Sequence, residues 1–231
     1  RLLTLGSHVQ MAERLLRRIS WGADTLVFTE GAFYGYARAT GLWERLSDET
    51  VRNEAHKMDG MRVKTLNAAG DDVFVDKRMN HSDVNGIVSE MASMIADPNF
   101  FVDVERRGLG FLNGLLVIHS DGSTTLHAHH QSNRLRTLLP FDYQPKPPEP
   151  TRWMQCVDEL WGADVETGEA ADPGCQSLLH EIMGYLLTND TSQQKIPLLL
   201  GPKRSGKGTI FRVLKKILDT APAAFDRALK K

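Results

Sequence analysis

Apolar residues recur every three or four positions in six stretches of the chain, a spacing that predicts amphipathic helices. In the first stretch Ala12, Leu15 and Ile19 share one face, while arginines occupy the other faces. Ser47 is a suitable N-cap for the second helix, and Pro98 ends the third because proline has no backbone N–H to donate. The predicted helices span about residues 7–20, 47–58, 82–97, 153–161, 176–188 and 210–218.

Other regions have the composition and alternation of strands. Residues 25–46 mix β-branched and aromatic residues with glycines, which predicts two or three short strands joined by turns. Residues 111–119 and 124–130 predict a hairpin, because the Asp121-Gly122 pair between them suits a tight turn with positive backbone angles. Residues 196–200, IPLLL, form a short continuous apolar run, which is typical of a strand buried on both faces of a parallel sheet.

A proline-rich segment interrupts this pattern. Residues 143–150, YQPKPPEP, hold four prolines in eight positions, so we expect an extended, semi-rigid linker. We therefore predict an α+β accessory domain over residues 1–143, a linker over 144–150, and the opening part of an α/β ATPase over 151–231. The first domain has apolar faces of its own and is expected to fold alone, so that limited proteolysis cuts within residues 143–150.

Composition and charge narrow the class of protein only slightly. The 28 basic and 29 acidic residues give a net charge of -1, so any binding to nucleic acid must rest on local patches. Cys156 and Cys175 are too few and too far apart for a disulfide framework or a thiolate zinc site. No apolar run has the length needed to span a bilayer, so we expect no membrane association and a cytoplasmic location.

The clearest chemical signal is the loop GPKRSGKGT, residues 201–209. A strand, a glycine-bounded loop ending in Gly-Lys and a following helix are the parts of a P-loop, whose backbone N–H groups surround a phosphate. Lys207 would reach the β and γ phosphates of ATP and is the predicted catalytic residue. The predicted nucleotide contacts are Gly201, Ser205, Gly206, Lys207, Gly208 and Thr209. The alternative is a glycine-rich turn that binds nothing.

The loop departs from the usual P-loop at the position that ligates Mg²⁺. A hydroxyl residue normally follows the lysine, whereas this chain has Gly208 there and Thr209 one residue later. Direct ligation of Mg²⁺ by the loop therefore stays open, and no other metal site is predicted. The loop also resembles that of adenylate kinases, where it lies near the N-terminus of the fold. Here 22 residues follow Thr209, so we do not expect a kinase.

With its flanking sequence, the chain resembles the phage and plasmid primase-helicases related to the poxvirus primase-helicase, whose motor is a superfamily 3 helicase. The resemblance covers most of residues 21–218, and the P-loop is its most specific part. The phrases that carry it are FYGYARATGLWERLSDETVRNEA, FLNGLLVIHSDG, HHQSNRLRTLLPFDYQPKPPEPTRW and HEIMGYLLTNDTSQQKIPLLLGPKRSGKGTIFRVLKKIL.

The resemblance implies a DNA replication protein of a phage, prophage or plasmid, acting in the cytoplasm of a bacterial host. An upstream primase domain would make primers, and a hexameric ring of motor domains would use ATP and Mg²⁺ to unwind DNA. Residues 21–143 match the accessory domain between them. The motor's acidic strand and arginine finger are not found after the P-loop, so we expect a truncated motor with little hydrolysis. The main rival is a non-enzymatic module that binds DNA or a replication partner.

Two polar clusters have less specific interpretations. His127 and His129 would share one strand face and could hold a metal ion, but no cysteine or carboxylate completes the set, so surface packing is favoured. Asp71, Asp72 and Asp76 surround a predicted turn, and we interpret them as part of a solvated loop rather than as catalytic carboxylates.

Basic and aromatic residues offer a second hypothesis of nucleic-acid binding. Arg106, Arg107, Arg134 and Arg136 could form a basic strip that contacts DNA phosphates, although scattered surface ion pairs are the simpler interpretation. Such binding would be weak and strongly salt-dependent. Tryptophans can stack on single-stranded bases, but three of the four lie in apolar or helical patterns that favour core packing.

Overall fold

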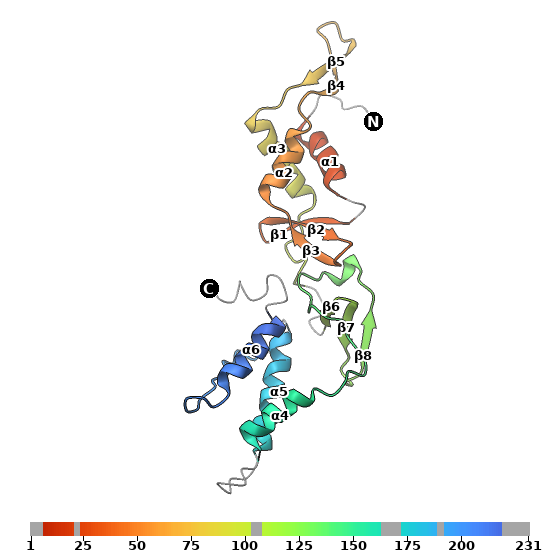
Figure 1. Cartoon of the computed structure of the whole chain (residues 1–231). Helices are drawn as coiled ribbons and strands as arrows, with labels where there is room; N and C mark the ends of the chain where they lie inside the picture. The colour runs from red at the N-terminus through yellow and green to blue at the C-terminus, as the bar shows by residue number, and fades with distance from the viewer. Residues whose placement is uncertain (1–6, 21–23, 103–107, 163–171, 189–191, 219–231) are drawn as a thin grey trace. The chain divides into compact units, whose positions relative to one another are not determined.

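The computed structural model describes residues 7–20, 24–102, 108–162, 172–188 and 192–218 (Figure 1). Its contacts divide the chain into two compact units. Unit 1 comprises Arg1–Val104 and His130–Arg136, and unit 2 comprises Glu105–His129 and Thr137–Lys231. The chain therefore leaves unit 1, returns to it at His130 and leaves again after Arg136. The domain boundary expected at the proline-rich segment stays a prediction.

The helices of unit 1 form where the apolar spacing predicts them. They are α1 His8–Ile19, α2 Asp48–His56 and α3 His81–Met94. Ser7, Ser47 and Asn80 cap them, each accepting a hydrogen bond from the backbone N–H three residues later. These caps satisfy N–H groups that have no partner within the helix. Helix α3 ends three residues before the predicted position.

The apolar faces of the three helices meet in the main core of unit 1. Met11 and Leu15 of α1 and Ile87 and Met91 of α3 are fully buried there. Met58 is also fully buried, although it lies two residues beyond the end of α2. Burial of each such side chain stabilises the fold by roughly 1.5–3 kcal/mol, so these contacts hold unit 1 together.

A small antiparallel sheet packs beside this core. Its strands are β1 Leu26–Thr29, β2 Ala32–Ala37 and β3 Leu42–Arg45, paired in chain order. Glu30 and Gly31 join β1 to β2 with φ angles of 51° and 72°, and two positive angles give the tight turn that matches the twist of paired strands. The prediction of short strands over residues 25–46 is confirmed.

A second hairpin was not predicted. Strands β4 Met61–Leu66 and β5 Asp72–Lys77 pair antiparallel, and Val63 at their base is buried in the main core. The interpretation of Asp71, Asp72 and Asp76 as members of one solvated loop is wrong, because Asp72 and Asp76 lie within β5. Alternating apolar and polar residues on β4 and the continuous apolar run Val73-Phe74-Val75 on β5 are typical of strands, and the connecting turn places Gly70 at a φ of 86°.

Residues 130–136, here called the clasp, return to unit 1 and contact two of its aromatic rings. The guanidinium carbon of Arg134 lies 4.4 Å from the centroid of the Phe100 ring, and that of Arg136 lies 4.4 Å from the Phe101 centroid. Arg134 also donates to the Phe100 carbonyl oxygen at 2.8 Å, and Arg136 donates to the Glu30 carboxylate at 2.8 Å. Both arginines therefore have neutralising or stacking partners inside the unit.

Trp43 fixes the backbone of the clasp to β3. Its indole N–H donates to the carbonyl oxygen of Gln131 at 2.9 Å, and its backbone N–H donates to that of Leu135 at 2.7 Å. The Trp43 side chain is 3% exposed and packs with a second aromatic core that includes Tyr34. The expected core role of this tryptophan is confirmed.

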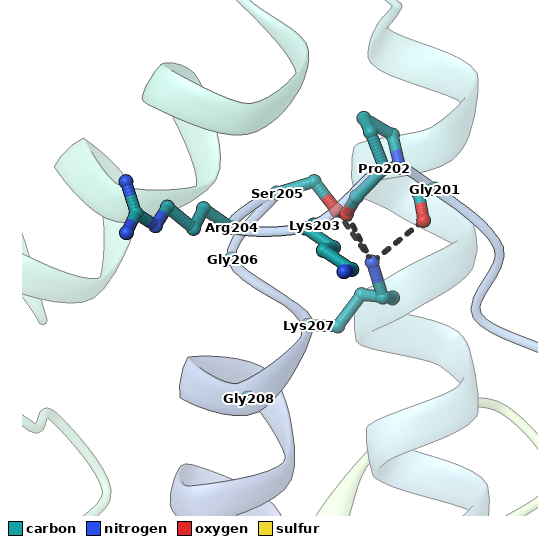
Figure 2. Close-up of a pocket in the computed structure, with 8 residues that line it drawn as sticks. All are labelled: Gly201, Pro202, Lys203, Arg204, Ser205, Gly206, Lys207 and Gly208. Carbon is teal, nitrogen blue, oxygen red and sulfur yellow. Dashed lines mark hydrogen bonds between the residues drawn. The ribbon is translucent and has the colours of Figure 1, made fainter.

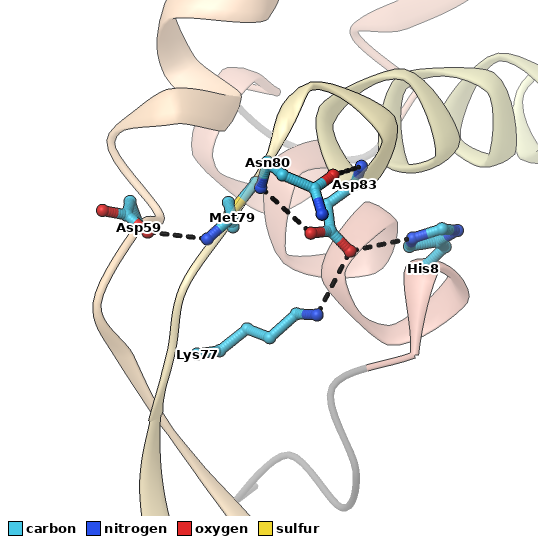
Figure 3. Close-up of polar contacts among 6 residues, drawn as sticks. All are labelled: His8, Asp59, Lys77, Met79, Asn80 and Asp83. Atoms are coloured by element: carbon cyan, nitrogen blue, oxygen red, sulfur yellow. Dashed lines mark hydrogen bonds and ion pairs between the residues drawn. The ribbon is translucent and has the colours of Figure 1, made fainter.

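A polar network ties the start of α1 to the start of α3 (Figure 3). Asp83 accepts a hydrogen bond from the Asn80 backbone N–H at 3.0 Å, which completes a reciprocal capping box. Its Oδ1 atom also lies 3.1 Å from Lys77 Nζ and 3.4 Å from His8 Nε2. The Asn80 N–H bond, followed by the Lys77 bond, lowers the pKa of the Asp83 carboxyl.

This network predicts a pH dependence of stability. Because the folded pKa of Asp83 is lowered, its charge stabilises unit 1 above the unfolded pKa, near 4, and this contribution disappears as pH falls through the folded pKa. Asp83→Asn should therefore lower the melting temperature at pH 7 and have a shrinking effect below pH 4. Thermal unfolding across this range tests the prediction. Asp142→Asn, at an exposed position, is the control and should change the melting temperature little. An effect of Asp83→Asn that does not depend on pH would contradict the prediction.

The described residues of unit 2 form a sheet and three helices. Strands β6 Gly108–Phe111, β7 Gly114–Ile118 and β8 Thr124–His127 pair antiparallel in chain order, so the predicted hairpin exists and has a third strand. Gly122 in its turn has a φ of 82°. The helices are α4 Thr151–Trp161, α5 Pro173–Leu187 and α6 Lys207–Leu218, close to their predicted ranges.

The helices of unit 2 share a small core. Val157 of α4, Leu179 of α5, and Ile210 and Leu214 of α6 are its buried members. The predicted apolar stripes therefore face one another, and they place the start of α6 beside α4 and α5. Among the described helices of the chain, none combines the length and apolar character that crossing a membrane requires.

Candidate nucleotide-binding loop

The loop at residues 201–206 ends directly at the N-terminus of α6, whose first residue is Lys207. Arg204 and Gly206 have φ angles of 68° and 71°, so the backbone turns twice through the left-handed region before the helix begins. The loop borders an open hollow of about 350 Å³, lined by every residue from Gly201 to Gly208 (Figure 2). A helix N-terminus behind a curved loop is a favourable place for an anion.

Lys207 holds the loop closed over its own helix. Its Nζ atom donates to the carbonyl oxygens of Gly201 at 2.8 Å and Pro202 at 2.6 Å, and to Ser205 Oγ at 2.8 Å (Figure 2). All three acceptors belong to the loop, so the ammonium group lies inside the hollow. The structure therefore brings together the predicted residues Gly201, Ser205, Gly206 and Lys207.

Glycine at position 206 is favoured by its backbone angle, and a larger residue there would force a neighbouring side chain to move. A Cβ atom added there would lie 2.3 Å from Leu160 Cδ2, which is closer than real atoms approach. Leu160 belongs to α4 and packs against the core of unit 2, so α4 supports the loop from outside. The helix that carries Leu160 was predicted over residues 153–161, but the sequence gave no signal of this contact with the loop.

The two residues that follow Lys207 have different surroundings. Gly208 is exposed, and an added Cβ would meet no atom within 4 Å. The Thr209 hydroxyl accepts a hydrogen bond from Arg212 Nη2 at 3.3 Å, and Arg212 Nε donates to the Gly208 carbonyl oxygen at 3.2 Å. The hydroxyl nearest to the usual Mg²⁺-ligating position is thus already in contact with a cation.

The strand predicted over residues 196–200 is not formed. Ile196, Leu198 and Leu200 are 86%, 78% and 88% exposed, while Leu199 packs against the core of unit 2. A strand is held by hydrogen bonds to neighbouring strands, and none of the described residues pairs with this segment. Without paired neighbours the apolar run forms no strand, and most of its side chains are exposed.

Residues 12–162 match the family of proteins described as D5 N terminal like. The chain belongs to this family. Domains of this family occur in primase-helicase proteins. The predicted membership of a replication-associated primase-helicase family is therefore confirmed. No curated protein matches the chain significantly. The candidate loop at 201–208 lies outside the matched residues, so the D5 N terminal like match does not bear on nucleotide binding.

The D5 N terminal like region extends beyond the accessory domain inferred from local phrases. The accessory domain was predicted over residues 1–143, with local phrases from residue 21 onward, whereas the match covers residues 12–162: it begins within α1 and runs past residue 143 to include α4. The fully buried side chains of α1 explain its inclusion, because the core of unit 1 is incomplete without them. The mixed α and β content expected for this region is confirmed.

Two histidines of the D5 N terminal like region have hydrogen-bond partners within the protein. His119 Nε2 lies 2.9 Å from Thr125 Oγ1, and His129 Nε2 lies 3.1 Å from the Leu112 carbonyl oxygen. His127 ends β8, so His129 lies beyond the strand on which the two were expected to share a face. No group of three or more potential metal ligands occurs in the part of the chain that the structure describes.

The basic strip was the less favoured hypothesis for this region, beside scattered surface ion pairs, and its two described members have partners within unit 1. Arg134 and Arg136 are engaged with Phe100, Phe101 and Glu30 inside unit 1. Residues 106 and 107 lie outside the described residues. These contacts are enough to explain the two arginines by a structural role within unit 1. The two arginines lie in a segment without helical or strand periodicity, so the sequence does not indicate which residues they contact.

Proposed function

We propose that this chain is the portion of a phage, prophage or plasmid primase-helicase in which an accessory domain is followed by the nucleotide-binding loop of an ATP-driven DNA helicase. One observation supports the role of the loop: Lys207, whose Nζ atom is bonded to the loop, lines the hollow at the N-terminus of α6. The family match supports the replication context, since D5 N terminal like domains belong to primase-helicase proteins.

The residues of the loop fit a nucleoside triphosphate. The N–H groups at the start of α6 would bind phosphate oxygens, and Lys207 would exchange its three loop acceptors for them. ATP supplies the phosphoryl group whose hydrolysis would drive strand separation, aided by Mg²⁺. Thr209 is the nearest hydroxyl for this ion, although Gly208 occupies the usual ligand position. The implied partners are DNA, an upstream primase domain and further copies in a hexameric ring, in the bacterial cytoplasm.

Replacing Lys207 tests this role. Lys207→Ala should weaken the binding of a fluorescent ATP analogue about 10- to 100-fold, because charge-assisted hydrogen bonds to phosphate are worth roughly 1.5–3 kcal/mol. Fluorescence anisotropy titrations of the 231-residue chain measure the effect. Lys195→Ala, an exposed change outside the hollow, is the matched control and should bind normally.

A non-enzymatic replication module is the alternative. It is favoured by the exposure of the segment before the loop, since a P-loop functions at the end of a strand held in a sheet. In this case the wild-type chain would bind the ATP analogue no better than Lys207→Ala does. Release of phosphate that depends on Lys207 would instead support a motor that works in this chain as it stands.

A further inference from the structure

The β4–β5 hairpin has two free strand edges. It is a two-stranded sheet, and among the described residues no third strand pairs with it. Figure 1 shows the hairpin extending beyond the three helices of unit 1, to which its base is joined through Val63. An exposed edge of this kind offers unpaired N–H and C=O groups to another strand.

The turn of the hairpin shows which groups these are. Asn67 N–H donates to the Asp71 carbonyl oxygen at 2.9 Å, so this pair points inward. Inward and outward residues alternate along antiparallel strands. The N–H and C=O groups that point outward therefore belong to Arg62, Lys64 and Leu66 on β4 and to Asp72, Phe74 and Asp76 on β5.

The side chains of these six residues share one face of the hairpin, because strand side chains alternate with a period of two. The two edges carry opposite charge: Arg62 and Lys64 lie on β4, and Asp72 and Asp76 lie on β5. The two strands of the hairpin show that these charges can pair across a β-ladder, since Lys64 forms an ion pair with Asp72. Each edge is therefore suited to a strand that resembles the opposite edge.

This charge pattern determines which pairings are possible between copies. Two β4 edges would place Arg62 and Lys64 of one copy beside the same residues of the other. Two β5 edges would similarly oppose Asp72 and Asp76, and like charges on facing strands are destabilising. A symmetric pairing of identical edges is thus disfavoured, whereas β4 of one copy against β5 of another is complementary.

We propose that the β5 edge is a docking site for β4 of a second copy of this chain, added antiparallel in a head-to-tail manner. In the register of the hairpin itself, Arg62 of the added strand would lie opposite Asp76, and Lys64 would lie opposite Phe74. The Phe74 side chain is 50% exposed and Leu66 is 60% exposed. The added Leu66 would lie diagonal to Phe74, so the contact also covers the apolar residues left exposed on this face.

A charge swap separates this contact from general charge effects. The swapped chain carries Arg62→Asp, Lys64→Asp, Asp72→Lys and Asp76→Arg, which preserves attraction within its own hairpin. Wild type should self-associate in sedimentation velocity, and the swapped chain should do so within about threefold of the wild-type affinity. Energy transfer between differently labelled wild-type and swapped chains should report association about tenfold weaker or more, since their edges repel.

Two further variants control the experiment. Asp72→Lys with Asp76→Arg reverses one edge and should abolish self-association, with circular dichroism reporting whether the fold is retained. Asp142→Arg reverses an exposed charge in unit 2 and should leave association unchanged. A wild-type chain that sediments as a monomer at every concentration would overturn the proposal. So would swapped and wild-type chains that associate with each other as well as with themselves.

Discussion

Trp43→Ala is expected to destabilise unit 1 by about 3–5 kcal/mol, the usual cost of removing a large buried aromatic side chain. The Trp43 ring lies 4.7 Å from Phe100 and 5.7 Å from Tyr36, measured between ring centroids. Its removal leaves a cavity in the aromatic core and deprives the Gln131 carbonyl oxygen of its donor. Urea denaturation followed by far-UV circular dichroism measures the change.

Trp43→Phe separates the two contributions. It keeps a ring in the core but removes the indole N–H, so it should cost less than the alanine change, about 1–3 kcal/mol. Val9→Ala is a matched control, because Val9 is largely exposed on α1. Equal stability losses for Trp43→Ala and Val9→Ala would mean that the aromatic core does not support unit 1.

Gly206→Ala is expected to destabilise the packing of α6 on α4 by about 2 kcal/mol or more, because strain and overpacking add. Alanine at a φ of 71° adopts a left-handed conformation that costs roughly 1–2 kcal/mol. Its Cβ would also displace Leu160 from the position it holds against the loop. Thermal unfolding measures the loss, and the variant should also bind an ATP analogue more weakly.

Gly208→Ala is the matched control and should have the opposite sign. Gly208 lies within α6 with open space around it, so alanine should stabilise the helix by about 0.5–1 kcal/mol. The two variants add the same methyl group two positions apart. If both lower stability equally, the backbone angle and the Leu160 contact are not what require glycine at position 206.

The sequence predicted elements whose patterns are local. Helix α1 has an N-cap, an apolar stripe and a polar end within a few residues, and the structure places it as predicted. The β7–β8 hairpin was predicted from its Asp121-Gly122 turn, whereas β6 was not predicted as a separate strand. Hairpin β4–β5 was not predicted because its acidic residues were interpreted as part of a loop, although Met61 and Val63 alternate with Arg62 and Lys64 on β4.

The candidate site divides in the same way. The loop from Gly201 to Lys207 is contiguous, so its residues could be named from the motif alone. Contacts between segments far apart in the sequence could not be predicted from the motif. The contact between Leu160 and Gly206 is one of them. The exposed Ile196–Leu200 segment shows the converse limit, since a strand pattern forms a strand only where hydrogen-bonding neighbours exist.

The clasp affects how this protein can be dissected. Because residues 130–136 belong to unit 1 while the residues on either side of them belong to unit 2, a single cut between positions 104 and 130 separates the rest of unit 1 from the clasp. A fragment ending before the clasp would expose Trp43, Phe100 and Phe101, which are apolar surfaces that favour aggregation. Supplying the missing heptapeptide in trans would then be a form of fragment complementation, with recovery of solubility as its signal.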